Sequence, residues 1–205
     1  MFELRETHKT KQLVFINEAG EVAQKVCKTC ERLKPAEEFP LNSDGCLRAH
    51  CEPCFKEYKR NYDKANKDRR TVLRHKKRAE KLGLPDNFTE EELSELKAFA
   101  AGRCMISGEE EVELQVDHVQ AVSKGWLGNM KGNLILVSEK VNHTKGTMSI
   151  FEFIKSERSN GLIDREQLER TFKYLAQAND MSFAEYIDFL KLAEELARRN
   201  KEYWR

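Results

Sequence analysis

Two pairs of cysteines limit what the N-terminal part of this chain can fold into more than any other feature. Cys27 and Cys30 form one C-x-x-C pair, Cys51 and Cys54 form a second, and twenty residues separate the two pairs. Each C-x-x-C turn directs two sulfurs at one ion, and this spacing is typical of a tetrahedral Zn²⁺ site made of four thiolates. The alternative is that the four thiols are buried without a metal.

The residues around these cysteines predict a small β-rich module that depends on its metal. Segments 11–16 and 21–26 have strand patterns on either side of a turn, but the module has too few apolar residues to fold alone. A zinc ion with four protein ligands has no open coordination position, so the module should position a partner rather than catalyse. Cys46 and His50 lie in the same loop and could replace a ligand, although we expect them to take no part.

The segment after the second cysteine pair is strongly basic. Residues 55–85 carry a net charge of +8, whereas the whole chain carries +1. The run is rich in helix formers and ends at Gly83, which predicts one long helix. A solvated helix is the ordinary explanation of a charge run, but this excess of one sign is too large for self-neutralising pairs. We therefore expect phosphate contacts with nucleic acid from Lys59, Arg60, Arg69, Arg70, Arg74, Lys76, Lys77 and Arg78.

The next segment predicts a helix followed by a strand, a loop, a second strand and a second helix. Thr89 and Glu92 have the spacing of a capping box at the start of the first helix. Both strands show apolar patterns, and Ser138 can cap the second helix. The predicted elements are a helix over residues 90–101, strands over 111–118 and 133–137, and a helix from 138 to about 146.

The polar residues along these elements resemble those of the HNH nucleases. In that family an acid–histidine pair ends the first strand, an asparagine precedes the second, and an asparagine or histidine stands on the helix shortly before a lysine. The matching positions hold Asp117 and His118, then Asn133, then Asn142 or His143, and Lys145. The resemblance covers about residues 104–147 and implies a ββα-metal fold.

The chemistry that the resemblance implies suits these side chains. Asp117 and Asn142 offer hard oxygen ligands of the kind that Mg²⁺, or alternatively Mn²⁺, prefers. A neutral His118 can accept the proton of an attacking water, because the unperturbed pKa of histidine is about 6.5. We expect the strand to end at this pair so that ligand and base converge on one phosphate. By the same resemblance Asn133 holds the loop between the strands through backbone hydrogen bonds. Lys145 lies three residues after Asn142 and hence on the same helix face, so it could contact a phosphate.

Two features depart from the commoner form of the family. Many members hold a zinc ion beside this motif through two C-x-x-C pairs, but only Cys104 is present here, and the later positions are Ser138 and Val141. We expect no zinc there and expect packing of neighbouring helices to replace it. The helix ligand is also open, because His143 could coordinate in place of Asn142; we favour Asn142 because Mg²⁺ prefers oxygen to imidazole.

The C-terminal third predicts three helices, over residues 148–158, 164–178 and 182–203, and an apolar stripe with helical spacing follows the last of them. Core packing explains such a stripe, and a surface for a protein partner is the alternative, with Tyr203 and Trp204 at its end.

The whole chain is predicted to be α+β, in four segments: a zinc knuckle over 1–54, a basic connector over 55–85, an HNH-like domain over 86–150 and a helical region over 151–205. The charged N-terminus and the lack of long apolar runs indicate a cytoplasmic protein.

We expect the chain to hydrolyse DNA phosphodiester bonds, nicking one strand as a monomer or cutting both as a dimer. The resemblance implies 5′-phosphate and 3′-hydroxyl ends, and the pairing of a zinc knuckle with an HNH motif is similar to small nucleases of bacteriophages and mobile elements. A non-catalytic nucleic-acid- or protein-binding adaptor is the alternative function. An RNA nuclease is a third, since a metal ion and a base do not distinguish the sugar.

Overall fold

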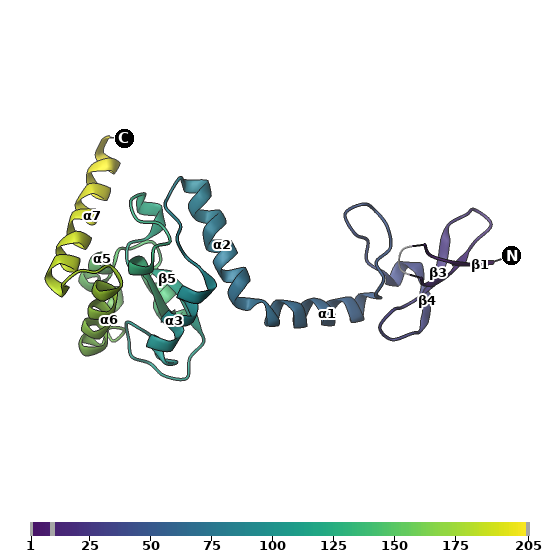
Figure 1. The fold of residues 1–205 in the computed structure, drawn as a ribbon, viewed down its shortest axis with the longest axis horizontal. Coiled ribbons are helices and arrows are strands. Elements are labelled where there is room, and N and C mark those ends of the chain that lie inside the picture. The colour runs from purple at the N-terminus through teal and green to yellow at the C-terminus, as the bar shows by residue number, and fades with distance from the viewer. Residues whose placement is uncertain (1, 9–10, 204–205) are drawn as a thin grey trace. The chain divides into compact units, whose positions relative to one another are not determined.

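The computed structural model describes residues 2–8 and 11–203 of the 205-residue chain. Its contacts divide the chain into two compact units, Met1–Lys67 and Asp68–Arg205, which are described separately below (Figure 1). Seven α-helices and two antiparallel sheets occur among the described residues, so the predicted α+β class is confirmed. The division between the units falls inside the predicted basic connector.

The N-terminal unit is built on a four-stranded antiparallel sheet whose strands follow chain order. The predicted turn joins the second and third strands: Gly20 has a φ of +81°, which glycine adopts without strain, and Asn17 Oδ1 accepts a hydrogen bond from the Glu21 N–H at 2.9 Å. The buried apolar cluster is small, which agrees with the expectation of a poor core. The strands are β1 (Glu3–Glu6), β2 (Leu13–Ile16), β3 (Val22–Val26) and β4 (Leu33–Pro35), followed by a short 3₁₀-helix, Ala36–Glu38.

The prediction of one long basic helix is wrong, because two helices, α1 (Glu52–Ala65) and α2 (Lys67–Leu82), meet at Asn66. Asn66 leaves helical geometry, with φ −113° and ψ 23°, and its backbone N–H donates to the carbonyl of Tyr62. The side-chain Nδ2 of Asn66 donates to the same carbonyl at 2.8 Å. An asparagine that bonds the nearby backbone in this way competes with continuation of the helix.

The C-terminal unit contains the predicted order of helix, strand, loop, strand and helix. Thr89 and Glu92 form the capping box expected from their spacing. The two strands pair antiparallel, with Asp117 opposite Ile135 and His118 opposite Leu134. The elements are α3 (Glu90–Ala100), β5 (Leu114–His118), β6 (Leu134–Ser138) and α4 (Glu139–Lys145).

Three more helices complete this unit, as predicted: α5 (Ile150–Lys155), α6 (Arg165–Ala178) and α7 (Phe183–Tyr203). The stripe of α7 enters the core through Tyr186, Leu190, Ala193 and Ala197, which confirms the packing explanation for these four residues. Phe183 at the start of the helix stays exposed. Trp204 and the side chain of Tyr203 lie outside the described part of the chain, so a partner surface at that end stays a prediction.

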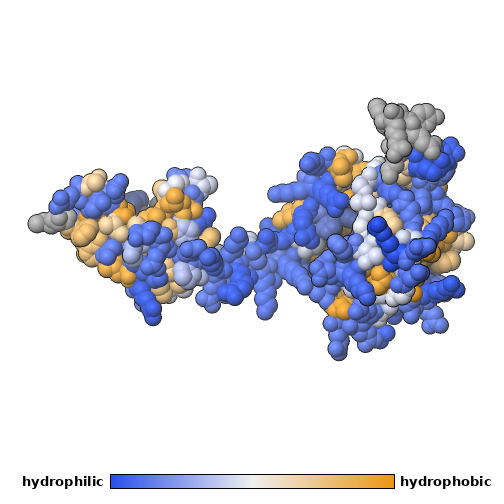
Figure 2. Space-filling model, turned by 180° about the vertical axis from the view of Figure 1, so that it is seen from behind, coloured by the Kyte–Doolittle hydropathy of each residue, from blue (hydrophilic) through white to orange (hydrophobic). Residues whose placement is uncertain are grey.

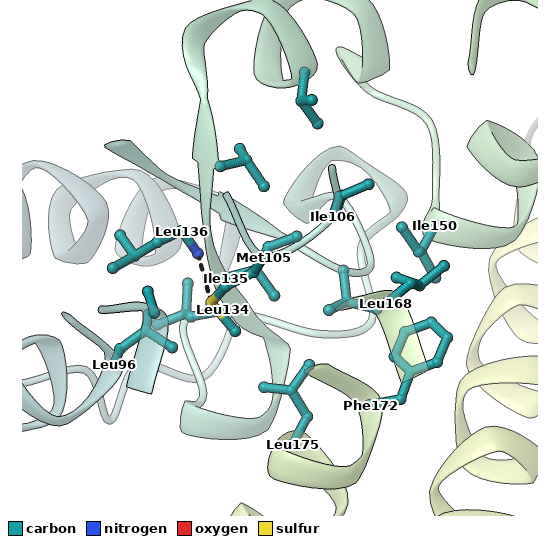
Figure 3. Packing of buried hydrophobic residues seen from close by; sticks show 14 of the residues in the cluster. Leu96, Met105, Ile106, Leu134, Ile135, Leu136, Ile150, Leu168, Phe172 and Leu175 are labelled. Carbon is teal, nitrogen blue, oxygen red and sulfur yellow. Dashed lines mark hydrogen bonds between the residues drawn. The ribbon is translucent and has the colours of Figure 1, made fainter. Parts of the chain in front are cut away.

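Strand β6 lies at the centre of the apolar core, and all five of its residues are buried. Figure 3 shows Leu134, Ile135 and Leu136 close to side chains from α3, α5 and α6. The Leu136 N–H donates to the sulfur of Met105 at 3.1 Å, which ties the segment before β5 to the strand. Because β6 is buried on both faces, it is a rigid support for its partner strand β5, which carries residues of the candidate site.

Candidate functional site

The four cysteines of the two C-x-x-C pairs meet in the N-terminal unit. Cys27 and Cys30 follow β3, Cys51 is the N-cap of α1 and Cys54 lies in its first turn. The four sulfurs all lie within 4.8 Å of one another. Within residues 2–8 and 11–203, no other set of three or more His, Cys, Asp or Glu side chains is gathered in this way. The cluster can hold a metal such as zinc.

Backbone groups favour a thiolate at one corner of the cluster. Burial acts to raise the pKa of the Cys27 thiol, but hydrogen bonds from the backbone of Cys30, Cys51 and Thr29 outweigh it and lower the pKa to about 6. The hydrogen bond with the Cys51 thiol, burial and the other sulfurs raise the pKa of Cys54 to about 12. All four groups can therefore be thiolates together only when a cation offsets their repulsion, and four soft sulfur donors fit Zn²⁺.

The two other residues considered as ligands lie outside the cluster. Cys46 is exposed. His50 is engaged elsewhere, because its Nδ1 lies 2.7 Å from the hydroxyl of Thr29 and its ring stacks on Tyr58. The expectation that Cys46 and His50 take no part agrees with these positions.

In the C-terminal unit, Asp117 faces α4 and meets Lys145. The Lys145 Nζ lies 2.9 Å from Asp117 Oδ2, and the side chains of Lys145 and Asp117 are 0% and 11% exposed. A carboxylate removed from water needs a counter-charge, which Lys145 supplies. The predicted phosphate contact of Lys145 is therefore wrong for this structure, because α4 packs this side chain inward against Asp117 and leaves none of it on the surface.

His118 has different neighbours from Asp117. Its Nε2 lies 2.9 Å from Asn129 Oδ1, and its ring centroid lies 5.4 Å from that of His75 on α2. Burial lowers the pKa of His118, so its imidazole is neutral at neutral pH. Strand β5 ends at His118 as predicted, and the side chains of Asp117 and His118 leave the strand toward opposite faces. The charges of Asp117 and Lys145 nevertheless act on the pKa of His118, in opposite directions.

Three residues around His118 were missed by the sequence analysis: His75, Asp86 and Asn129. The Nδ2 of Asn129 donates to Asp86 Oδ1 at 2.7 Å, which orients the amide oxygen toward His118. His75 is buried, with a Nδ1 atom that has no hydrogen-bond partner in the described part of the chain. Burial lowers the pKa of His75 to about 4, and positive charge on His118, when that imidazole is protonated, and on Arg74 and Arg78 acts in the same direction.

Only one of these three residues carried a sequence signal. Val72, His75 and Ala79 have the helical spacing of an inner face, and all three pack inward from α2. Asp86 and Asn129 stand 43 residues apart in turns and follow no local periodicity. Contacts of this kind depend on the tertiary fold and could not be read from the sequence.

Asn133 secures the loop between β5 and β6. Its Oδ1 accepts a hydrogen bond from the Gln120 N–H at 2.8 Å, and its Nδ2 donates to the carbonyls of Gln120 and Gly128 at 3.1 and 3.0 Å. Gly128 lies so close to Pro85 that a Cβ there would be 1.9 Å from the Pro85 carbonyl oxygen, so only glycine fits. These bonds are of the type required for the positioning role assigned to Asn133 by resemblance.

The two candidate helix ligands stand on α4 beside β5. The Nδ2 of Asn142 donates to Gln115 Oε1 at 2.6 Å, whereas His143 is exposed. Gln115 and Asp117 lie on the same face of β5, so Asn142 and Asp117 share the interface between β5 and α4. Asn142 and His143 line an open pocket of about 740 Å³ together with Gln115, Glu139, Lys140 and Gly146.

The eight cations predicted on the connector are all exposed. Lys59 and Arg60 lie on α1, and the other six lie on α2, whose inner face carries His75. Arg78 lies close enough to both buried histidines that its charge lowers the pKa of His75 and of His118. The outer side of α2 therefore presents positive charge next to His118.

A comparison of the chain with protein-family models and with curated protein sequences finds no significant match. Of the helices formed by the described residues, none combines the length and the apolar character needed to cross a membrane.

Proposed function

We propose that this chain is a metal-dependent nuclease of the HNH class that cuts DNA, with a structural zinc ion in its N-terminal unit. The observation that carries the proposal is the shared interface of β5 and α4, on which Asp117 and Asn142 lie beside a buried ammonium group. The match between this strand, strand and helix order and the sequence pattern of Asp117, His118, Asn133 and Asn142 supports the assignment to the HNH class.

Asp117 and Asn142 are the residues that would hold Mg²⁺ or Mn²⁺. Their donor chemistry fits a hard cation: one carboxylate, and one amide whose nitrogen already donates to Gln115 and whose carbonyl oxygen remains as the ligand. A bound ion would supply charge stabilisation at the phosphate. Lys145 Nζ already lies 2.9 Å from Asp117 Oδ2, so a bound cation would have to displace this ammonium group or share the carboxylate with it.

The other residues would prepare the attacking water and the substrate. His118 is neutral because burial lowers its pKa, and a neutral imidazole can accept a proton. Asn129, held by Asp86, fixes the orientation of the His118 ring, and Asn133 fixes the loop. For His118 to reach a water beside Asp117, its ring must turn from its contact with Asn129. The exposed cations of α2, with Arg78 nearest, would bind the phosphate backbone.

A second candidate, a non-catalytic nucleic-acid- or protein-binding adaptor, is favoured by one specific observation. His118 is buried against Asn129 and His75, and Lys145 occupies the position beside Asp117, so the residues of the site are closed off in this form. An adaptor would keep this arrangement when nucleic acid binds, whereas a nuclease must open it.

Plasmid cleavage tests the two candidates. Purified full-length protein is incubated with supercoiled plasmid and Mg²⁺ or Mn²⁺, and a nuclease is expected to produce nicked or linear DNA with 5′-phosphate and 3′-hydroxyl ends. The His118→Ala variant should lose at least about 100-fold in rate, which is the range for removal of a general base.

The matched control is His8→Ala, which removes an exposed histidine from the N-terminal unit and should cut at the wild-type rate. EDTA should stop cleavage, and Mg²⁺ added in excess should restore it. Binding of plasmid without any cleavage by wild-type protein would favour the adaptor, and full activity of His118→Ala would refute the assignment of the base. The same assay on single-stranded RNA decides whether the sugar matters.

A further inference from the structure

Three aromatic rings form a ladder at α1 in the N-terminal unit: the partly buried His50, just before the helix, and the exposed Tyr58 and Tyr62 on it. The ring centroids of His50 and Tyr58 lie 5.8 Å apart with planes 8° from parallel, and those of Tyr58 and Tyr62 lie 6.4 Å apart at 28°. Tyr58 is 56% exposed and Tyr62 is 50% exposed. Large aromatic side chains that are half exposed in a row are not needed for the core of this unit, which is formed by other residues.

One end of the ladder is fixed in place. His50 is held by the hydrogen bond between its Nδ1 and the hydroxyl of Thr29, at 2.7 Å. Because His50 directly precedes Cys51, the metal-ligand cluster also limits its movement. A partner that binds these rings therefore meets a surface that is already ordered, which reduces the entropic cost of binding.

Cations lie on the same side of α1 as the rings. Phe55, Tyr58, Lys59 and Tyr62 follow helical spacing i, i+3, i+4 and i+7, so they share one face of the helix. The guanidinium of Arg48 lies over the ring of Phe55, at 4.5 Å from its centroid, and Lys59 is exposed. Blue, hydrophilic side chains surround this helix on the face seen in Figure 2. Aromatic faces next to single cations are the combination that binds nucleobases and their phosphates.

We propose that the His50, Tyr58 and Tyr62 ladder is a stacking surface for unpaired nucleobases, so that the nucleic-acid substrate contains single-stranded or unpaired segments. Bases inside an intact duplex do not expose their faces, so only unpaired bases can stack on these rings. Lys59 and Arg48 would contact the phosphates on either side. This inference rests on the nucleic-acid partner of the proposed function but not on its cleavage chemistry.

Binding measured without added Mg²⁺ or Mn²⁺ tests this inference separately from cleavage. Fluorescence anisotropy of full-length, zinc-loaded protein is recorded with a labelled oligo(dT) strand and with a duplex of the same length. Tyr58→Ala and Tyr62→Ala should each weaken binding of the single strand by about tenfold, the effect of losing one stacked base, and should change duplex binding by less than about twofold. Tyr58→Phe should bind like the wild type, because the ring is kept.

Two controls make the result decisive. Leu192→Ala removes an exposed apolar side chain from α7 in the C-terminal unit and should change neither affinity. Zinc content must equal that of the wild type in each tyrosine variant, which shows that the N-terminal unit is folded. Equal losses for the single strand and the duplex, or unchanged affinity of both alanine variants, would overturn the proposal. A loss in Tyr58→Phe as large as in Tyr58→Ala would also overturn it, since the hydroxyl and not the ring would then be the contact. Failure of the cleavage assay would leave this outcome untouched.

Discussion

The two units of this chain are stabilised in opposite ways. The N-terminal unit buries Cys27, Phe39 and Cys51 in a cluster that also includes the partly buried Cys30, Leu47 and Cys54, so most of its centre consists of thiols. The C-terminal unit buries a continuous apolar core around β6 and carries its candidate site on that core. The chain thus combines a unit whose four cysteines could hold a metal with a unit held by apolar packing, and each should fail under different conditions.

Loss of the metal should produce the largest effect, and only in the N-terminal unit. Zn²⁺ binding to such sites contributes about 10–16 kcal/mol of apparent free energy at neutral pH, far more than this small cluster can supply by apolar burial. We expect Cys27→Ser to lose its zinc and to unfold the sheet of β1–β4. Metal analysis should find about one zinc per wild-type chain, and the absorption of Co²⁺-loaded protein reports the thiolate site directly.

The control for this variant is Cys46→Ser, which changes an exposed thiol outside the cluster and should retain the zinc. Trp126 lies in the C-terminal unit and residues 1–67 contain no tryptophan, so tryptophan fluorescence does not report the N-terminal unit. If zinc removal also unfolded the unit that contains Trp126, the two units would not be independent and the comparison would fail.

Breaking the buried ion pair should have the next largest effect, and only in the C-terminal unit. Lys145→Met keeps the length of the side chain but leaves Asp117 buried without its counter-charge, which should lower the free energy of unfolding by about 3–5 kcal/mol. If Asp117 and Asn142 hold a divalent cation, Mg²⁺ at millimolar concentration should restore part of this loss. Denaturant unfolding followed by tryptophan fluorescence measures both changes.

The double variant Asp117→Asn/Lys145→Met removes both charges and serves as the control. It should be more stable than Lys145→Met alone and should gain nothing from Mg²⁺. If Mg²⁺ raised the free energy of unfolding of the double variant as much as that of Lys145→Met, the ion would bind elsewhere and Asp117 would not be a ligand.

A smaller effect should follow from acidification. The pKa of His75 is lowered from 6.5 to about 4 in the folded protein, so the unfolded chain binds a proton more readily between these values. The free energy of unfolding therefore keeps its full value above about pH 6.5 as far as His75 is concerned. As the pH falls from about 6.5 to about 4, it decreases by at most about 3 kcal/mol in total. Denaturant midpoints measured by tryptophan fluorescence across this range should fall accordingly.

The variant His75→Gln should show a flatter pH dependence over the same range, and His8→Gln should show the wild-type dependence. His118, whose pKa is also lowered by burial, contributes in the same direction, so His75→Gln should not remove the slope entirely. A wild-type stability that does not change between pH 7 and pH 4 would mean that these histidines are not buried as described.

The sequence was a good guide wherever local patterns decide the structure. The cysteine spacing predicted the cluster of four sulfurs, and the capping box at Thr89, the cap at Ser138 and the period of α7 predicted helices that the structure contains. The break at Asn66 was missed because composition alone favoured a helix there, although the asparagine carried the signal of a residue that bonds nearby backbone.

The candidate site was predictable only in part, because its contacts join distant segments. The sequence placed Asp117, His118 and Asn142 on neighbouring elements but could not show that Lys145 would turn inward to Asp117 or that His75 and Asn129 would surround His118. Both arrangements depend on which faces of α2 and α4 are buried, and burial is set by the whole core rather than by any one segment.

The interruption at Asn66 also has an evolutionary consequence. Because a single residue separates α1 from α2, each unit ends in a complete helix of its own, and recombination at this point would cut through no sheet and no core. A different small module could be joined to α2 by gene fusion, or this module could be moved to another protein, without redesign of either interior. The chain is therefore built in a way that lets its N-terminal unit be exchanged while its C-terminal unit is inherited unchanged.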